Sequence, residues 1–153
     1  MASKTRLSAL FGAASLTLAA SGAAAATNPD AIKGDWWTEE RDAIVRIDER
    51  DGVFFGELLW TEEADAKDDE NPAPELRTRP LRGLVFLKGF RFDDGEWSGG
   101  SVYAPDDGKT YSGYMKLDGP DTLKLRGYVG LRLFGRTATW SRVASDSYPE
   151  GVK

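Results

Sequence analysis

The stretch EWSGGSVYAPDDGKTYSGYMKL, residues 96–117, holds two runs of aromatic and small side chains separated by a turn that begins with proline. Residues 96–104 and 109–117 alternate in part between apolar and polar side chains, which is typical of a half-buried β-strand. PDDG at 105–108 has the composition of a tight turn. The stretch therefore predicts a β-hairpin, and the same pattern can be followed in both directions along the chain.

Short strands and turn signals alternate through most of the sequence. A first strand is predicted at DWWT, residues 35–38, a hairpin at 43–60 around Asp51-Gly52, and further strands at 83–92, 122–129 and 135–143. With the two runs already described, about eight strands follow one another. An antiparallel meander of this kind closes as a barrel or packs as a sandwich, and an eight-stranded barrel is just wide enough for one small ligand. We expect the last ten residues to form a frayed tail.

Glycines occupy interior positions in several of the predicted strands, namely Gly56, Gly99, Gly100, Gly113 and Gly127. Glycine weakens a strand unless a bend, a bulge or a close approach requires it. Bending of the sheet is the favoured interpretation here. The alternative is that some of these glycines clear interior space for a ligand.

The N-terminus has the features of a signal for export. Lys4 and Arg6 precede an apolar run of small residues, and the segment ends in an Ala24-x-Ala26 pattern. This is typical of a secretory signal peptide over residues 1–26, cut before Thr27. The expectation is an exported bacterial protein, periplasmic or secreted, whose residues 27–153 form one domain with its core at 34–143. No other stretch is apolar enough to predict a membrane span.

Composition excludes several classes of chemistry. The chain has 20 basic and 25 acidic residues, and loss of Lys4 and Arg6 would take the net charge from −5 to −7, unlike a nucleic-acid binder. It has no cysteine and no histidine, which excludes disulfides, Ser-His-Asp and Cys-His catalysis, and imidazole zinc sites. We predict no catalytic residues, no metal and no cofactor.

Between two predicted strands lies a long charged segment, residues 61–82. Acidic side chains fill its first half, and its second half combines three prolines with three arginines. Loops this long are usually functional or disordered. We predict a stiff cover over one mouth of the barrel, in which Asp69, Asn71, Arg77 and Arg79 take part. The alternative is a merely solvated charged loop.

Three motifs together resemble a known bacterial family: DDENPAPELRTRPLRGL at 68–84, WSGGSVYAPDDGKTYSGYMKL at 97–117 and LRGYVGLRLFGRTATWSR at 125–142. They look like the domain of unknown function 2147 (DUF2147), small exported proteins whose biochemical activity is not established. The resemblance covers roughly residues 34–143. It implies an all-β, lipocalin-like (calycin) barrel.

A second resemblance concerns the two ends of the barrel sequence. Gly34-Asp35-Trp36 looks like the Gly-x-Trp that opens the first strand of lipocalins, and Arg142 stands where lipocalins carry a basic residue over that tryptophan. First and last strands are neighbours in a closed barrel. We therefore expect Arg142 to lie over Trp36 and to seal the barrel, a structural role.

Five residues are candidates for a ligand site. Glu57 lies in mid-strand and could pair with Arg126 if that face of the sheet points inward, while Trp97 and Tyr103 on one face of a strand, with Tyr111 on the next, could form an aromatic wall. Core packing is the simpler interpretation of the aromatic residues.

The function expected is the binding of a small apolar or amphipathic molecule in the bacterial envelope. The alternative is a packed barrel that docks a partner through residues 61–82. The ligand, the partner and the oligomeric state stay open.

Overall fold

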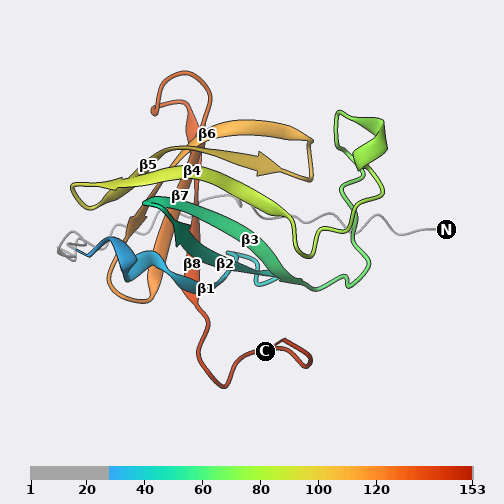
Figure 1. Cartoon of the computed structure of the whole chain (residues 1–153), viewed down its shortest axis with the longest axis horizontal. Helices are drawn as coiled ribbons and strands as arrows, with labels where there is room; N and C mark the ends of the chain where they lie inside the picture. The colour runs from blue at the N-terminus through green and yellow to red at the C-terminus, as the bar shows by residue number, and fades with distance from the viewer. Residues whose placement is uncertain (1–27, 153) are drawn as a thin grey trace.

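Eight antiparallel strands, each hydrogen-bonded to its neighbour in chain order, close into a barrel in the computed structural model, which describes residues 28–152 (Figure 1). The all-β meander and its closure as a barrel are confirmed, and the sandwich alternative is excluded. The predicted signal peptide at 1–26 lies outside the described residues.

The strands are β1 (Gly34–Trp37), β2 (Ala43–Arg50), β3 (Val53–Thr61), β4 (Val85–Asp93), β5 (Glu96–Ala104), β6 (Lys109–Leu117), β7 (Thr122–Tyr128) and β8 (Gly135–Arg142), with two short 3-10 helices, η1 (Pro29–Ile32) and η2 (Pro74–Leu76). Across residues 28–152 no helix is long and apolar enough to cross a membrane.

Tight turns build the hairpins where the sequence predicts them. Asp51 and Gly52 have φ angles of 54° and 77°, and Asp94 and Gly95 have 45° and 80°. Positive φ at both central residues is required by the two-residue turn whose twist matches that of the strands, and Asp-Gly is a favoured pair for it.

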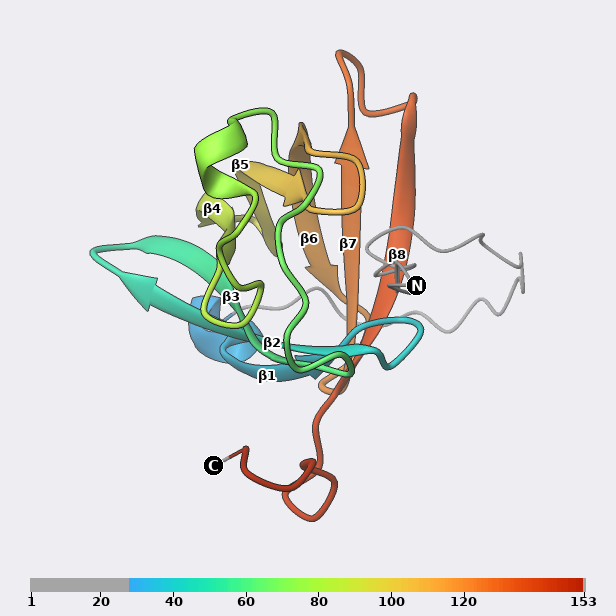
Figure 2. The same ribbon diagram turned by 90° about the vertical axis from the view of Figure 1, so that its right-hand side faces the viewer.

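The two ends of the barrel differ, and they are called the closed end and the open end. Helix η1 and the turns after β2, β4 and β6 lie at one end, the closed end. Residues 62–84, the turn at 105–108 and the loop at 129–134 lie at the other, the open end. In Figure 2 residues 62–84 cross in front of the barrel, and in Figure 1 they lie beside the ends of β3 and β4.

The closing seam joins β1 to β8 through only two residue pairs, Trp36 with Arg142 and Trp37 with Ser141. By comparison, β7 and β8 pair from Thr122 with Ser141 to Tyr128 with Gly135. The seam is therefore the shortest strand pairing in the described barrel.

Core side chains fill the barrel from Trp36 and Trp97 at the closed end to Phe86 and Leu81 at the open end, where Leu81 belongs to residues 62–84. Fully buried large residues include Trp36, Trp97, Trp140, Phe86, Phe90, Leu58, Leu87, Met115 and Leu123. Three interior glycines make room for them, because a Cβ on Gly100 would lie 2.4 Å from the Phe90 ring, and Cβ atoms on Gly56 and Gly113 would lie 2.7 Å from Leu87 and Val102. The space that these glycines clear is thus occupied by the core.

A β-bulge in β5 changes which side chains face inward. The register shifts between Trp97 and Gly100, and Gly99 has a φ of +75°, which allows the extra residue. Trp97 is fully buried, whereas Tyr103 is half-buried and belongs to the opposite alternation from buried Val102 and Ala104. The prediction that Trp97 and Tyr103 share a face is therefore wrong, because the bulge inverts the alternation between them.

The C-terminal segment returns to the outside of the barrel. Tyr148 donates a hydrogen bond of 2.7 Å from its hydroxyl to Asp35 Oδ2, and it packs beside Trp37, Ile44 and Val143. The expected frayed tail is thus attached to β1.

Candidate functional site

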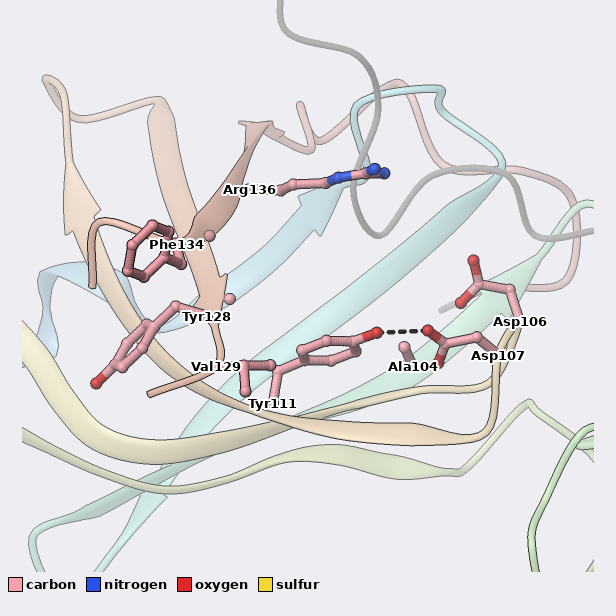
Figure 3. Close-up of a pocket in the computed structure, with 10 residues that line it drawn as sticks. Ala104, Asp106, Asp107, Tyr111, Tyr128, Val129, Phe134 and Arg136 are labelled. Carbon is pink, nitrogen blue, oxygen red and sulfur yellow. Dashed lines mark hydrogen bonds between the residues drawn. The ribbon is translucent and has the colours of Figure 1, made fainter. Parts of the chain in front are cut away.

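A pocket of about 430 Å³ lies at the open end, between the β5–β6 turn and the loop that joins β7 to β8. Figure 3 shows the side chains that line it, with the hydroxyl of Tyr111 directed at Asp107, and Arg136 on another side. The lining consists of Ala104, Asp106, Asp107, Tyr111, Gly127, Tyr128, Val129, Phe134, Gly135 and Arg136.

Alternation along the strands carries two of these side chains into the barrel mouth. Arg136 shares the face of buried Ala138 and Trp140 on β8, and Tyr111 shares the face of buried Gly113 and Met115 on β6. Arg136 is exposed although it shares a face with core residues. The packed interior thus ends below these side chains, and the inward-facing positions above it surround open space.

Acidic groups form one side of the pocket. The Tyr111 hydroxyl donates to Asp107 Oδ2, and this bond, together with burial, raises the pKa of Tyr111 to about 12. Burial and the neighbouring Asp107 raise the pKa of the Asp106 carboxyl above its ordinary value. Asp106 is therefore more readily protonated than a solvated aspartate.

The opposite side of the pocket combines one cation with apolar groups. Arg136 lies across the mouth from the Asp107–Tyr111 pair in Figure 3, with Val129 and Phe134 on the neighbouring loop. Apolar walls with a few polar groups are the usual composition of a small-molecule site. The accessible lining of this pocket is more polar than apolar, so it suits a small molecule that has polar or charged groups beside an apolar part.

Of the five predicted ligand-site residues, Tyr111 lines the pocket and Trp97 does not. Trp97 lies in the core, with its ring 4.8 Å from that of Phe92, and its Nε1 donates to the carbonyl of Pro29 in η1 at 3.2 Å. It forms part of the floor at the closed end.

The predicted pair of Glu57 and Arg126 is not formed. On β3 the buried positions are Phe54, Gly56 and Leu58, so Glu57 belongs to the outer face. Arg126 is likewise on the outer face of β7, where its guanidinium donates to the carbonyls of Arg132 and Leu133 at 2.8 and 3.1 Å and to the Thr137 hydroxyl at 3.0 Å. Both side chains therefore lie outside the barrel interior. The residues next to them in each strand face inward instead.

Tyr103 contacts the segment at 62–84 instead of the pocket. Its hydroxyl donates to Asp68 Oδ1 at 2.5 Å, and Asp68 is completely buried. Oδ2 of the same carboxylate accepts from Asn71 Nδ2 and Arg79 Nε, each at 2.7 Å. Burial and the Asp68 carboxylate raise the pKa of Tyr103 to about 12.

The arginines of this segment hold it together. Arg77 donates to the carbonyl of Asn71 at 2.7 Å, and Arg82 donates to the carbonyl of Thr61 at 2.6 Å. Asp69, which the sequence analysis selected, is exposed, and its neighbour Asp68 is the acid that faces inward.

The same segment rests on the rim of the pocket. A Cβ on Gly108, in the β5–β6 turn, would lie 2.0 Å from the carbonyl oxygen of Glu70. Buried Leu81 joins the barrel core from the other half of the segment. Residues 62–84 therefore cover part of the open end. They leave uncovered the side of the barrel mouth that Tyr111 and Arg136 line.

Trp36 and Arg142 meet at the closed end. The guanidinium carbon lies 4.1 Å from the centroid of the indole, and the guanidinium donates to the carbonyls of Pro120, Lys33 and Ala31 at 2.9, 3.0 and 2.8 Å. Trp36 Nε1 donates to the carbonyl of Ile32 at 2.9 Å. The contact that the lipocalin resemblance implies is present.

Most residues of the pocket were not predicted from the sequence. Arg136 alternates with Ala138 and Trp140, and this pattern alone could have placed it inward. Asp106 and Asp107 have the composition of a tight turn, which gives no sign of a role in a pocket, whereas the apolar residues among 129–134 are a signal that could have been recognised. The lining residues that were not predicted are Ala104, Asp106, Asp107, Gly127, Tyr128, Val129, Phe134, Gly135 and Arg136.

Comparison with known proteins agrees with the geometry of the barrel. Residues 34–142 match the model of a family described as "uncharacterized protein conserved in bacteria (DUF2147)". A solved structure described as protein HP1028 from the human pathogen Helicobacter pylori, which belongs to the lipocalin family, is similar with a TM-score of 0.68 and 27% identity, over 75% of this chain and 84% of that one. No curated protein sequence matches the chain. The chain belongs to the DUF2147 family, and its fold is a lipocalin-like barrel.

Proposed function

We propose that this protein binds a small amphipathic molecule in its open-end pocket, and that it does so in the bacterial envelope after export directed by residues 1–26. The observation that carries the proposal is the pocket of about 430 Å³ at the mouth of a closed barrel. Small-molecule sites typically measure about 300–1,000 Å³.

The lining suggests how such a molecule would lie. Its apolar part would pack on the ring of Tyr111 and against Val129 and Phe134. Arg136 would meet an anionic end, because a guanidinium presents a fork of donors that matches carboxylate or phosphate oxygens. We therefore expect an anionic end to bind against Arg136, on the side of the pocket away from the carboxylates of Asp106 and Asp107.

Native mass spectrometry of the purified protein tests for a retained molecule, and titration with anilinonaphthalene sulfonate, an anionic aromatic amphiphile, tests the site itself. We expect saturable binding that Arg136→Gln weakens by roughly tenfold, since a hydrogen bond to a charged group contributes about 1.5–3 kcal/mol. Arg50→Gln is the matched control, because Arg50 is exposed at the closed end, and it should leave the affinity unchanged.

Equal affinities of the two variants, or the lack of saturable binding and of any retained molecule, would contradict the proposal. The alternative function, docking of a partner through residues 62–84, would then be preferred. It is supported by the packed lower interior and by the buried Asp68, which holds that segment against the barrel.

A further inference from the structure

The loop between β7 and β8 carries an unusual set of exposed side chains. Val129, Leu131, Leu133 and Phe134 are 66%, 66%, 78% and 67% exposed, and these four are called the apolar tip. Among the described residues, Leu76 is the only other large hydrophobic residue classed as exposed, at 38%. Figure 2 shows this loop projecting beyond the barrel at the ends of β7 and β8.

Hydrogen bonds reach four carbonyls and two backbone N–H groups of the loop at 129–134. Phe134 N donates to the carbonyl of Leu131 at 2.9 Å, and Val129 N donates to the carbonyl of Phe134 at 3.3 Å. Arg126 reaches from β7 to the carbonyls of Arg132 and Leu133. Unpaired backbone groups oppose entry into hydrocarbon, so the bonds to these four carbonyls lower that part of the cost of inserting the loop.

Aromatic and cationic side chains stand behind the apolar tip. The rings of Tyr114 and Tyr128 lie 6.3 Å apart, and the Arg132 guanidinium lies 4.3 Å from the Tyr114 ring. Arg132 also pairs with Glu96 at 2.5 Å, which offsets part of its charge, while Arg126 and Arg136 supply two further cations. These five residues, Tyr114, Tyr128, Arg126, Arg132 and Arg136, are called the collar.

The order of side chains matches that of a membrane interface. Tyrosine is enriched at the level of lipid headgroups, and arginine can place its charge there while its stem covers apolar surface. Anionic lipids attract basic residues near the surface by about 1 kcal/mol each, so the collar acts locally although the whole chain is net negative.

We propose that the apolar tip inserts into a lipid bilayer that carries anionic headgroups, with the collar at headgroup level. The docked orientation would bring the open-end pocket near the bilayer, because Val129 and Phe134 belong to both the apolar tip and the pocket lining. Docking does not depend on whether the pocket binds a ligand.

The size of the apolar tip favours a bilayer over a protein partner or a second copy of this chain. Four side chains that are about two-thirds exposed present roughly 400 Å² of apolar surface. A stable protein interface buries about 800 Å² on each partner, with matched shapes. A bilayer accepts a small projecting loop without such matching.

Site-specific labelling tests where the protein meets the membrane. The chain has no cysteine, so Leu133→Cys provides one unique position for an environment-sensitive fluorophore such as nitrobenzoxadiazole. Leu76→Cys is the matched control, an exposed apolar position at the open end but in the other loop. Vesicles of phosphatidylglycerol and phosphatidylethanolamine should shift the emission of the Leu133→Cys label to the blue and leave the Leu76→Cys label unchanged.

A second variant tests whether the apolar tip drives the binding. Leu131→Ser combined with Leu133→Ser removes two exposed side chains that do not line the pocket, so fold and pocket should be retained. We expect vesicle co-sedimentation to weaken by roughly tenfold or more. All proteins in the comparison share the same N-terminus, so residues 1–26 contribute equally to each.

Four results would contradict the proposal, the last of them only its anionic headgroup. The Leu133→Cys label could remain unchanged on adding anionic vesicles, or the double serine variant could bind them as tightly as the original chain. Analytical ultracentrifugation could instead show a dimer that the double serine variant abolishes, which would assign the apolar tip to self-association. Equal binding to phosphatidylcholine vesicles would remove the anionic headgroup from the proposal. Unchanged binding of anilinonaphthalene sulfonate by the double serine variant separates all of these results from the fate of the ligand site.

Discussion

Arg142 connects three separated parts of the chain at the closed end of the barrel. Its guanidinium lies over Trp36 and donates to carbonyls in η1, in the residue that follows η1 and in the β6–β7 turn. A cation over an indole contributes about 0.5–2 kcal/mol, and hydrogen bonds to a charged group add to this. One side chain therefore ties the last strand to the segment that precedes the first.

Replacing this residue should lower stability without changing the fold. We expect Arg142→Ala to reduce the free energy of unfolding by about 2–3 kcal/mol and the melting temperature by roughly 6–12 °C, measured by calorimetry. Arg142→Lys keeps the charge near Trp36 but loses the fork of donors. Its melting temperature should therefore lie between those of the original protein and Arg142→Ala. An unchanged melting temperature in Arg142→Ala would show that the contact is not needed to hold the seam.

Tyr103 makes stability depend on alkaline pH. Burial and the Asp68 carboxylate raise its pKa from 10.0 to about 12 in the folded protein. Between these values the unfolded chain has lost this proton and the folded protein still holds it, so rising pH favours unfolding. The stabilisation due to the raised pKa is complete below pH 10 and is lost as the pH rises through about 12.

Urea denaturation across this pH range measures the effect against Tyr103→Phe, which cannot ionise. The original protein should be the more stable of the two near pH 10, and the difference should shrink as the pH approaches 12. A difference that is constant over that range would mean that Tyr103 does not carry the shifted titration.

At the scale of single residues, the sequence does not always indicate which side chain of a run faces inward, and this limits the prediction. The contact of Arg142 with Trp36 followed from a family resemblance. The choice of Asp69 instead of Asp68 was an error of one position within a run of acids, where no alternation indicates which carboxylate faces inward.

Among the elements, the segment at 62–84 depends most on a single buried group. Asp68 accepts hydrogen bonds from Tyr103 on β5 and from Asn71 and Arg79 within the segment. Removal of one partner of a buried ion pair leaves the other uncompensated, which typically destabilises by about 3–5 kcal/mol. Because Arg79 is partly exposed, the loss here should be smaller and largely local.

Limited proteolysis measures how firmly this segment is held. We expect trypsin to cut the original protein slowly after Arg77 and Arg82, which precede Thr78 and Gly83, and Asp68→Ala to be cut there many times faster while the strands stay intact. Asp69→Ala is the matched control, since Asp69 is the exposed neighbour, and it should behave like the original protein. Rapid cutting of the original protein throughout residues 61–82 would contradict the stiff cover.

Element types were easier to predict than element faces. Asp-Gly turns at Asp51-Gly52 and Asp94-Gly95 require positive φ, a local property that composition reveals. The bulge in β5 inverts which residues face inward, and it depends on the register with β6, which no single strand encodes. Tyr103 on β5 failed for this reason, whereas Glu57 on β3 and Arg126 on β7 failed because the sequence does not indicate which of the two alternating faces points inward.

For the whole molecule, the interior is divided into a packed part and an open part. Gly56, Gly100 and Gly113 admit Leu87, Phe90 and Val102 to the core, while Gly127 borders the pocket at the open end. The sequence predicted one closed barrel. It did not decide whether its interior glycines bend the sheet or clear space for a ligand. Only the assembled strands show how far the core side chains reach.

Hydrogen exchange should reveal the seam as the least protected strand pairing. Because β1 and β8 share only two residue pairs, we expect peptides that cover β1 to exchange faster than peptides that cover β7. Arg142→Ala should accelerate exchange in β1 and leave β5 and β6 unchanged. Protection of β1 equal to that of β7 would show that the barrel opens only by complete unfolding.

The short seam also determines how the barrel would respond to a force that pulls the N-terminal and C-terminal ends of the chain apart. β1 begins and β8 ends at the closed end, and Trp36 pairs with Arg142 directly beside these points. A force on both ends would act first on the attachment of Tyr148 to Asp35 and then on the seam pairs one after another. The barrel should therefore unzip at low force in an optical trap, whereas a pull between β4 and β7 would meet many hydrogen bonds at once.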